Sequence, residues 1–223
     1  MIEQELKFLL EQDEYFRLLD YLRSASFRII TYTMRNHYFD TAAFTLLKTG
    51  VALRLRSRDD VWFFTYKCRI KGKLYEQHRN GALINEEYEE MIDNVLAEDI
   101  LAGRKDLGDL PFEFMRQLER DLEVTKEFWK DVRCFGSMRV TRVKTTVVPY
   151  NIPLECDHVV YDDGAEEFEI ESETDNLALA ESVVQMIFRQ NGLPVRPNSV
   201  PKIIRFLKRS FPDPEVLNEW QDS

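Results

Sequence analysis

Cysteine is scarce in this sequence, which has only 3 cysteines in 223 residues. Cys68, Cys134 and Cys156 are far apart and form no CxxC pair. An odd number of widely spaced cysteines predicts neither a disulfide framework nor a zinc site. Repeats and low-complexity tracts are also lacking, and the 44% hydrophobic and 31% charged composition is that of an ordinary globular protein.

The chain also lacks long apolar runs and an excess of basic residues. No stretch approaches the roughly 20 apolar residues that cross a bilayer, and the start lacks the charged-then-apolar layout of a secretory signal. The 40 acidic and 30 basic residues give a net charge of −10, which argues against a nucleic-acid-binding surface driven by bulk electrostatics. We therefore expect a cytoplasmic protein without membrane or nucleic-acid partners, although a local basic cavity is compatible with this charge.

The segments that are present form two β-rich blocks separated by helical segments. Short β-type runs fill residues 29–83 and about 137–173. Helical spacing marks residues 13–24, with Asp13 as the candidate N-cap, then about 85–130, beginning at Asn85, and finally 177–190 and about 199–210. The pattern predicts an α+β fold. We expect a single domain over residues 1–211, with a helical insertion around 85–130 and a C-terminal tail at 212–223.

Charged residues recur at every second position of most of the predicted strands. Because strand side chains alternate between two faces, each charged set shares one face, and residues such as Leu6, Phe8 and Ile170 occupy the other. The sets are Glu3, Glu5 and Lys7; Arg54 and Arg56; Lys67, Arg69 and Lys71; Arg142 and Lys144; Glu155 and Asp157; and Glu169 and Glu171.

The sign of the charge is segregated by strand, with basic strands in the first block and acidic strands at the two ends. For any single pair, the simplest interpretation is a polar sheet face that looks at water. As a group, however, aligned like charges repel by roughly a few tenths of a kcal/mol per opposed pair, so another interaction should offset them. A closed barrel could turn these faces inward. Basic walls would then hold a polyanion, and carboxylates would hold hard divalent cations.

The order of these motifs resembles the CYTH family, also called the triphosphate tunnel metalloenzymes. EQELK at the start is similar to the family's ExExK signature, and HYFDT, ALRLR, TYK, RVK, LECD and EIE follow in the family's order, up to about Phe211. The chain looks like bacterial members of the inorganic triphosphatase and thiamine triphosphatase branches. The resemblance implies an eight-stranded antiparallel β-barrel, or tunnel, with helices packed outside. Within HYFDT, we expect Tyr38 and Phe39 to pack and Asp40 to hold a turn or an ion pair.

The resemblance also implies roles for individual residues. The implied metal ligands are Glu3, Glu5, Glu169 and Glu171, with Asp157 nearby and Glu155 as a lesser candidate. The implied triphosphate contacts are Lys7, Arg54, Arg56 and Lys67, with Arg142 or Lys144 on the next basic strand and Lys202 as a C-terminal lysine that closes over the phosphates. Glu5, Lys7, Arg56 and Glu171 are the catalytic candidates. Arg139 would point away from this face, and Lys202 is equally compatible with a solvated helix lysine.

The function implied by the resemblance is hydrolysis of a triphosphate that depends on Mg²⁺ or Mn²⁺. Inorganic triphosphate, thiamine triphosphate and nucleoside triphosphates share the moiety that these residues would bind. The metal would lower the pKa of an attacking water, and the basic residues would stabilise charge on the transferring phosphoryl group. Three alternatives stay open: a class IV adenylyl cyclase, a non-catalytic polyphosphate- or nucleotide-binding module, and a globular protein with charged sheet faces.

Overall fold

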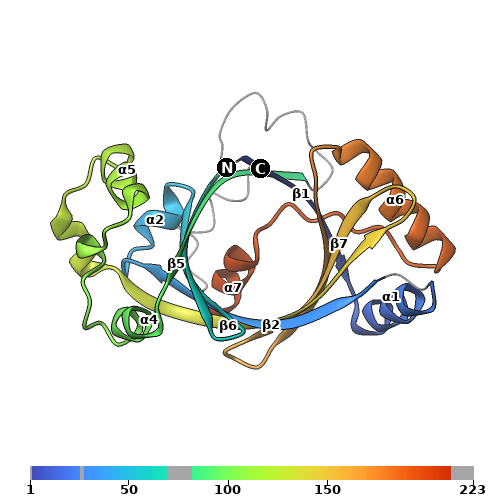
Figure 1. Ribbon diagram of the computed structural model, residues 1–223, viewed down its shortest axis with the longest axis horizontal. Helices are drawn as coiled ribbons and strands as arrows, with labels where there is room; N and C mark the ends of the chain where they lie inside the picture. The colour runs from blue at the N-terminus through green and yellow to red at the C-terminus, as the bar shows by residue number, and fades with distance from the viewer. Residues whose placement is uncertain (1, 26–27, 70–81, 212–223) are drawn as a thin grey trace.

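The structure is a computed structural model that describes residues 2–25, 28–69 and 82–211. Its strands form a closed barrel in the order β1-β5-β4-β3-β2-β6-β7-β8, and each neighbouring pair is antiparallel (Figure 1). The predicted α+β fold with an antiparallel eight-stranded barrel is therefore confirmed. The strands are β1 (Ile2–Leu10), β2 (Ile30–Asp40), β3 (Val51–Arg58), β4 (Val61–Arg69), β5 (Ala82–Ile92), β6 (Arg133–Val147), β7 (Ile152–Tyr161) and β8 (Glu166–Glu173).

Helices pack against the barrel on two opposite sides. Helices α1 and α6 lie on one side of the ring, and α2, α4 and α5 lie on the other (Figure 1). Among these helices and α7, none has the length and hydropathy of a membrane-spanning segment. The helical elements are α1 (Gln12–Ser24), α2 (Thr45–Lys48), α4 (Asn94–Leu101), η1 (Leu107–Asp109), α5 (Glu113–Asp121), η2 (Lys126–Asp131), α6 (Leu177–Gln190) and α7 (Lys202–Ser210).

The apolar faces of the strands point out of the barrel and pack against these helices. On β1, Leu6 and Phe8 are buried with residues of α1 and α6 in one hydrophobic core. On β3 and β4, Leu55 and Phe64 join α4 and α5 in a second core. Strand side chains alternate, so the charged residues of the same strands point into the barrel. The fold thus places its two main apolar cores outside the barrel and its charges inside.

Helix α7 is the exception, because it closes one end of the barrel from within. Ile203 and Phe206 pack against inward-facing residues of β6 and β7, including Val140 and Val159. At Gly136 on β6, an added Cβ would lie only 2.4 Å from Cζ of Phe206, so the absence of a side chain lets the helix approach the wall.

The prediction of a helix beginning at Asn85 was wrong, because residues 85–92 belong to strand β5. Asn85 pairs with Glu3 of β1, and Glu87 pairs with Lys67 of β4. Glutamate-rich segments have high intrinsic helix propensity, but pairing with β4 along the whole segment, and with β1 at Asn85 and Glu86, overrides it. The helical segments between β5 and β6 therefore start at α4. Residues 212–223, the predicted tail, lie outside the described residues.

Two local predictions near chain turns have different outcomes. Helix α1 begins after Glu11, not at Asp13, and the backbone N–H of Glu11 donates to Oε2 of Glu14 at 2.7 Å. Asp40 holds a turn as expected. Its carboxylate accepts hydrogen bonds from the backbone N–H groups of Thr41, Leu46 and Leu47 at 2.7–2.9 Å, and so it fixes the start of α2.

Candidate active site

A polar cavity of about 170 Å³ occupies the barrel lumen. Its wall contains most of the charged residues that the strand pattern singled out, contributed by strands from all around the barrel. The charged side chains that line it are Glu3, Glu5, Lys7, Arg54, Arg56, Lys67, Glu87, Arg142, Glu155, Asp157, Glu171, Glu173 and Lys202. Lys71 and the side chain of Arg69 lie outside the described part of the chain.

Strand register explains how charges of one sign come to share a surface. Glu155 lies directly opposite Glu171, and Asp157 lies opposite Glu169. On their other edges the same acids meet bases, because Lys7 pairs with Glu171, and β6 places Arg142 beside Asp157. Opposed carboxylates repel each other in a sheet. The neighbouring basic strands offset that repulsion.

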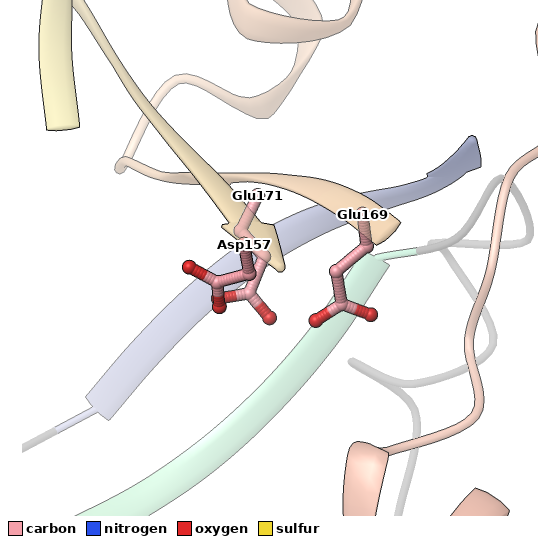
Figure 2. A group of neighbouring side chains, drawn as sticks. All are labelled: Asp157, Glu169 and Glu171. Carbon is pink, nitrogen blue, oxygen red and sulfur yellow. The ribbon is translucent and has the colours of Figure 1, made fainter. Parts of the chain in front are cut away.

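Asp157, Glu169 and Glu171 form a compact carboxylate group, called here the acidic triad (Figure 2). Each offers an oxygen, and these three oxygens lie within 4.8 Å of one another. All three residues are buried, Asp157 and Glu169 completely. Carboxylate oxygens are the ligands that hard divalent cations prefer, so the donor set fits Mg²⁺ or Mn²⁺.

Cations of the protein surround the acidic triad. Nζ of Lys202 lies 2.9 Å from Oδ2 of Asp157 and 2.7 Å from Oε1 of Glu171, and it also pairs with Glu169. Arg142 donates two hydrogen bonds to the carboxylate of Asp157, from Nε at 2.7 Å and from Nη2 at 2.6 Å. Its Nη2 also donates to Oε2 of Glu171 at 2.7 Å. Burial alone would raise the pKa of Asp157, but Arg142 and Lys202 together lower it below its ordinary value. Asp157 is therefore ionised around neutral pH.

A second group of acids lies on β1 and β5 around Lys67. Nζ of Lys67 is 2.5 Å from Glu3, 3.3 Å from Glu5 and 3.6 Å from Glu87. Burial raises the pKa of Glu3 to about 7, although Lys67 opposes the shift. Lys7 links this group to the acidic triad, because its Nζ lies 3.3 Å from Glu5 and 2.6 Å from Glu171.

Arg56 differs from every other cation of the cavity wall. Its Nε donates to Oδ1 of Asn36 at 2.9 Å, and among the described residues it forms no ion pair with a carboxylate. Burial, reinforced by the nearby charges of Arg54 and Arg142, lowers the pKa of Arg56 to about 10. Its neighbour Arg54 does have a carboxylate partner, Glu87, at 3.2 Å. Arg56 is thus a half-buried positive charge that an anion would satisfy.

The structure distinguishes between the sequence alternatives. Arg142 lines the cavity, whereas the side chain of Lys144 is about half exposed and pairs with Glu155 at 2.8 Å. Arg139 is exposed on the opposite face, as expected. Lys202 points into the lumen and is not a solvated helix lysine. Glu169 is buried beside the cavity wall, between Lys202 and Arg205.

Several residues of the wall were missed by sequence reasoning. Glu87 was hidden by the incorrect helix prediction, although the spacing of Asn85, Glu87 and Glu89 is the strand period. Asn36 and Tyr38 of β2 also line the cavity, and Tyr38 was expected only to pack. Their inward orientation follows from alternation along the HYFDT strand. This alternation is visible in the sequence and could have identified Asn36 and Tyr38 as residues that share one face of the strand.

Comparisons with known proteins agree with this architecture. A family model described as the CYTH domain matches residues 1–205. A protein from Hippeastrum, an adenylyl cyclase candidate described as having a dominant triphosphatase activity, is 26% identical; the match covers 92% of this chain and 95% of that chain with a TM-score of 0.79. An adenylate cyclase candidate from Bacillus halodurans is 26% identical over 91% of this chain and 95% of that chain, with a TM-score of 0.70. A Pyrococcus horikoshii protein, 20% identical over 93% of this chain and 99% of that chain with a TM-score of 0.54, shares the fold. A search of curated protein sequences found no match.

Proposed function

The chain belongs to the CYTH family, and on that premise we propose that it hydrolyses a triphosphate inside the barrel with the help of a divalent cation. One observation carries the proposal. A single cavity contains a half-buried arginine without a carboxylate partner among the described residues, Arg56, and it is lined or flanked by carboxylates that fit a hard cation. A metal-bound polyphosphate carries both complementary charges.

The basic residues of the lumen would bind the phosphate chain. Arg56 is available for a phosphate oxygen, and Nε of Arg54 has no hydrogen-bond partner among the described residues. Guanidinium groups suit bidentate contacts with phosphate, while Lys7, Lys67 and Lys202 would act as point charges. Arg142 is the proposed contact from β6, with Lys144 nearer the solvent. These residues would position the phosphates and stabilise the charge of the transferring phosphoryl group.

The acidic residues would hold the cation. Glu3, Glu5, Asp157, Glu169 and Glu171 are the proposed ligands, with Glu155 as a lesser one. Mg²⁺ or Mn²⁺, when bound, would neutralise phosphate charge and lower the pKa of a water molecule for in-line attack. The proposed catalytic residues are Glu5, Lys7, Arg56 and Glu171. Glu5 and Glu171 have pKa values below their ordinary range, because Lys67 and Lys7 outweigh burial at Glu5, and Lys202 and Lys7 do so at Glu171. Both carboxylates are therefore charged and ready to bind a cation.

Hydrolysis is favoured over cyclisation by the similarity to the Hippeastrum protein, for which a dominant triphosphatase activity is described. Inorganic triphosphate, thiamine triphosphate and nucleoside triphosphates are all candidate substrates, because the charged wall would bind the moiety they share. A class IV adenylyl cyclase would use the same groups to convert ATP into cyclic AMP. A binding module would take up the same ligand without reaction.

The test is phosphate release from inorganic triphosphate, thiamine triphosphate and ATP in parallel, with Mg²⁺ and then with Mn²⁺. Glu5→Gln removes one proposed ligand charge with little change in shape, and Glu90→Gln, at an exposed position of β5, is the matched control. We expect metal-dependent release that Glu5→Gln loses and Glu90→Gln keeps. Formation of cyclic AMP from ATP would establish the cyclase instead. Thermal stabilisation by triphosphate without any product would establish a binding module.

A further inference from the structure

Lys202 occupies the position where the acidic triad would hold a metal ion. Its ammonium nitrogen contacts all three carboxylates, at 2.9 Å from Asp157 and 2.7 Å from Glu171 and in an ion pair with Glu169. The ammonium group therefore lies between the three carboxylates and offsets part of their negative charge. Figure 2 shows the three side chains converging on one region from β7 and β8.

The space between the three triad oxygens holds one cation only. Oxygens that share a Mg²⁺ ion at about 2.1 Å lie at most about 4.2 Å apart, whereas the triad oxygens lie within 4.8 Å of one another. The carboxylates would need to close slightly around the metal. An ammonium group at its present distances would then be in direct contact with a like charge. Metal and Lys202 are thus mutually exclusive at this position.

Lys202 is the first residue of α7, and the helix is attached to β8 by a ladder of ion pairs. Arg205 pairs with Glu169 at 2.5 Å and with Glu167 at 2.6 Å, and Arg209 pairs with Glu167 at 3.2 Å. Glu169 is shared between Lys202, which contacts Oε1, and Arg205, which contacts Oε2, so a metal that takes Oε1 in place of Lys202 leaves the pair with Arg205 intact. Further along, Phe206 and Leu207 remain anchored in the apolar end of the lumen. Displacement of Lys202 would therefore loosen the first turn of α7 and leave the rest of the helix in place.

Building on the proposed function, we propose that Lys202 is the resident cation of the acidic triad and that a divalent cation binds there only by displacing it. The displaced ammonium stays in the cavity that it lines together with Arg54 and Arg56, and a phosphate oxygen becomes its new partner. Metal alone therefore binds weakly, because its arrival leaves Lys202 without a carboxylate. Metal and triphosphate then bind with positive cooperativity, and each raises the affinity for the other. Lys202 is a positioning residue that sets the affinity for the metal.

The test measures Mn²⁺ binding to the full chain without phosphate, by the electron paramagnetic resonance signal of free Mn²⁺. Metal binds only to the state in which Lys202 has left the triad. The apparent affinity for Mn²⁺ is therefore the intrinsic affinity multiplied by the fraction of molecules in that state. We expect Lys202→Met to bind Mn²⁺ about tenfold more tightly or better. Lys208→Met, which removes the same charge from an exposed position of α7, should match the wild-type protein.

Hydrogen exchange of the wild-type protein supplies a second readout that does not depend on any variant folding. Saturation with Mn²⁺ should accelerate exchange at the amides of Ile204 and Arg205, which donate to the carbonyl of Pro201, and leave Leu207 unchanged. Equal Mn²⁺ affinity in wild type and Lys202→Met, with α7 exchange unaffected by metal, would overturn the inference. If triphosphate hydrolysis still depends on Mn²⁺ in that case, the proposed function survives. Failure of both proteins to bind Mn²⁺ would also overturn the inference, and hydrolysis that is independent of metal would separately overturn the proposed function.

Discussion

Replacing Arg56 by glutamine should make the free protein more stable while destroying its proposed function. Arg56 is a half-buried cation with no carboxylate partner among the described residues, and Arg54 and Arg142 add repulsion. Its pKa falls to about 10, which means that the fold holds the proton less tightly than the unfolded chain does. Below pH 10 both states are protonated, and the full penalty of the buried charge acts on the folded state.

The size of this penalty follows from the pKa. A decrease from the ordinary arginine value to about 10 corresponds to about 3 kcal/mol. Loss of the packing made by the arginine stem offsets part of it, so we expect Arg56→Gln to raise the free energy of unfolding by about 1–2 kcal/mol. As the pH rises through 10, the wild-type protein begins to release the proton. The difference between the two proteins should therefore shrink by about 1 kcal/mol near pH 10.5.

The assay is urea unfolding at pH 8 and pH 10.5, in buffers free of phosphate and sulfate. Arg54→Gln is the matched control, because Glu87 raises the pKa of Arg54 despite burial, and its loss leaves Glu87 short of a partner. That variant should lose stability. In the hydrolysis assay, Arg56→Gln should lower kcat/KM. The decrease should correspond to a loss of about 2–4 kcal/mol of transition-state stabilisation. A loss of stability in Arg56→Gln as large as in Arg54→Gln would refute the reasoning, since it would mean that Arg56 is satisfied in the free protein.

Two further predictions concern residues outside the lumen. Asp40→Ala should lower the free energy of unfolding by about 2 kcal/mol, because three backbone N–H groups at the start of α2 lose their acceptor; an unchanged urea midpoint would show that α2 does not depend on this carboxylate. Leu6→Ala should cost about 3 kcal/mol of stability, since Leu6 is buried beneath α1 and α6. Its kcat at a temperature where the variant stays folded should equal that of the wild type, and a large decrease would contradict the separation of core and lumen.

The strands of the barrel and the inward direction of their charges could be predicted because strand alternation is a local property. Glu3, Glu5 and Lys7 share one face whatever surrounds them, and the structure turns that face into the cavity. Helix α6 was predicted at its observed bounds, Leu177–Gln190, because Asn191 and Gly192 mark its end. The catalytic, phosphate-binding and metal-binding roles of the individual residues remain predictions.

Other features depend on contacts that the sequence does not display. Residues 85–92 become a strand because β4 pairs with the whole segment and β1 pairs with Asn85 and Glu86. Lys202 stands at the start of a helix, where solvent exposure is the usual situation for lysine, and only the insertion of α7 into the lumen brings it to the acidic triad. Arg142 could not be separated from Lys144 by alternation, since both share a face. Depth along the strand decides between them, and depth is set by the whole barrel.

Because the two main apolar cores lie outside the barrel, a strand such as β1 carries two alternating sets of positions with different roles. In β1, Leu6, Phe8 and Leu10 pack in the core between the strand and the outer helices. Glu3, Glu5 and Lys7 alternate with them and set the charge of the lumen. We therefore expect substitutions in one series to have little effect on the packing of the other. An ancestral barrel of this kind could therefore exchange its interior residues, and with them its ligand, without passing through an unfolded intermediate form. The same separation makes the lumen a suitable place to engineer new anion specificity.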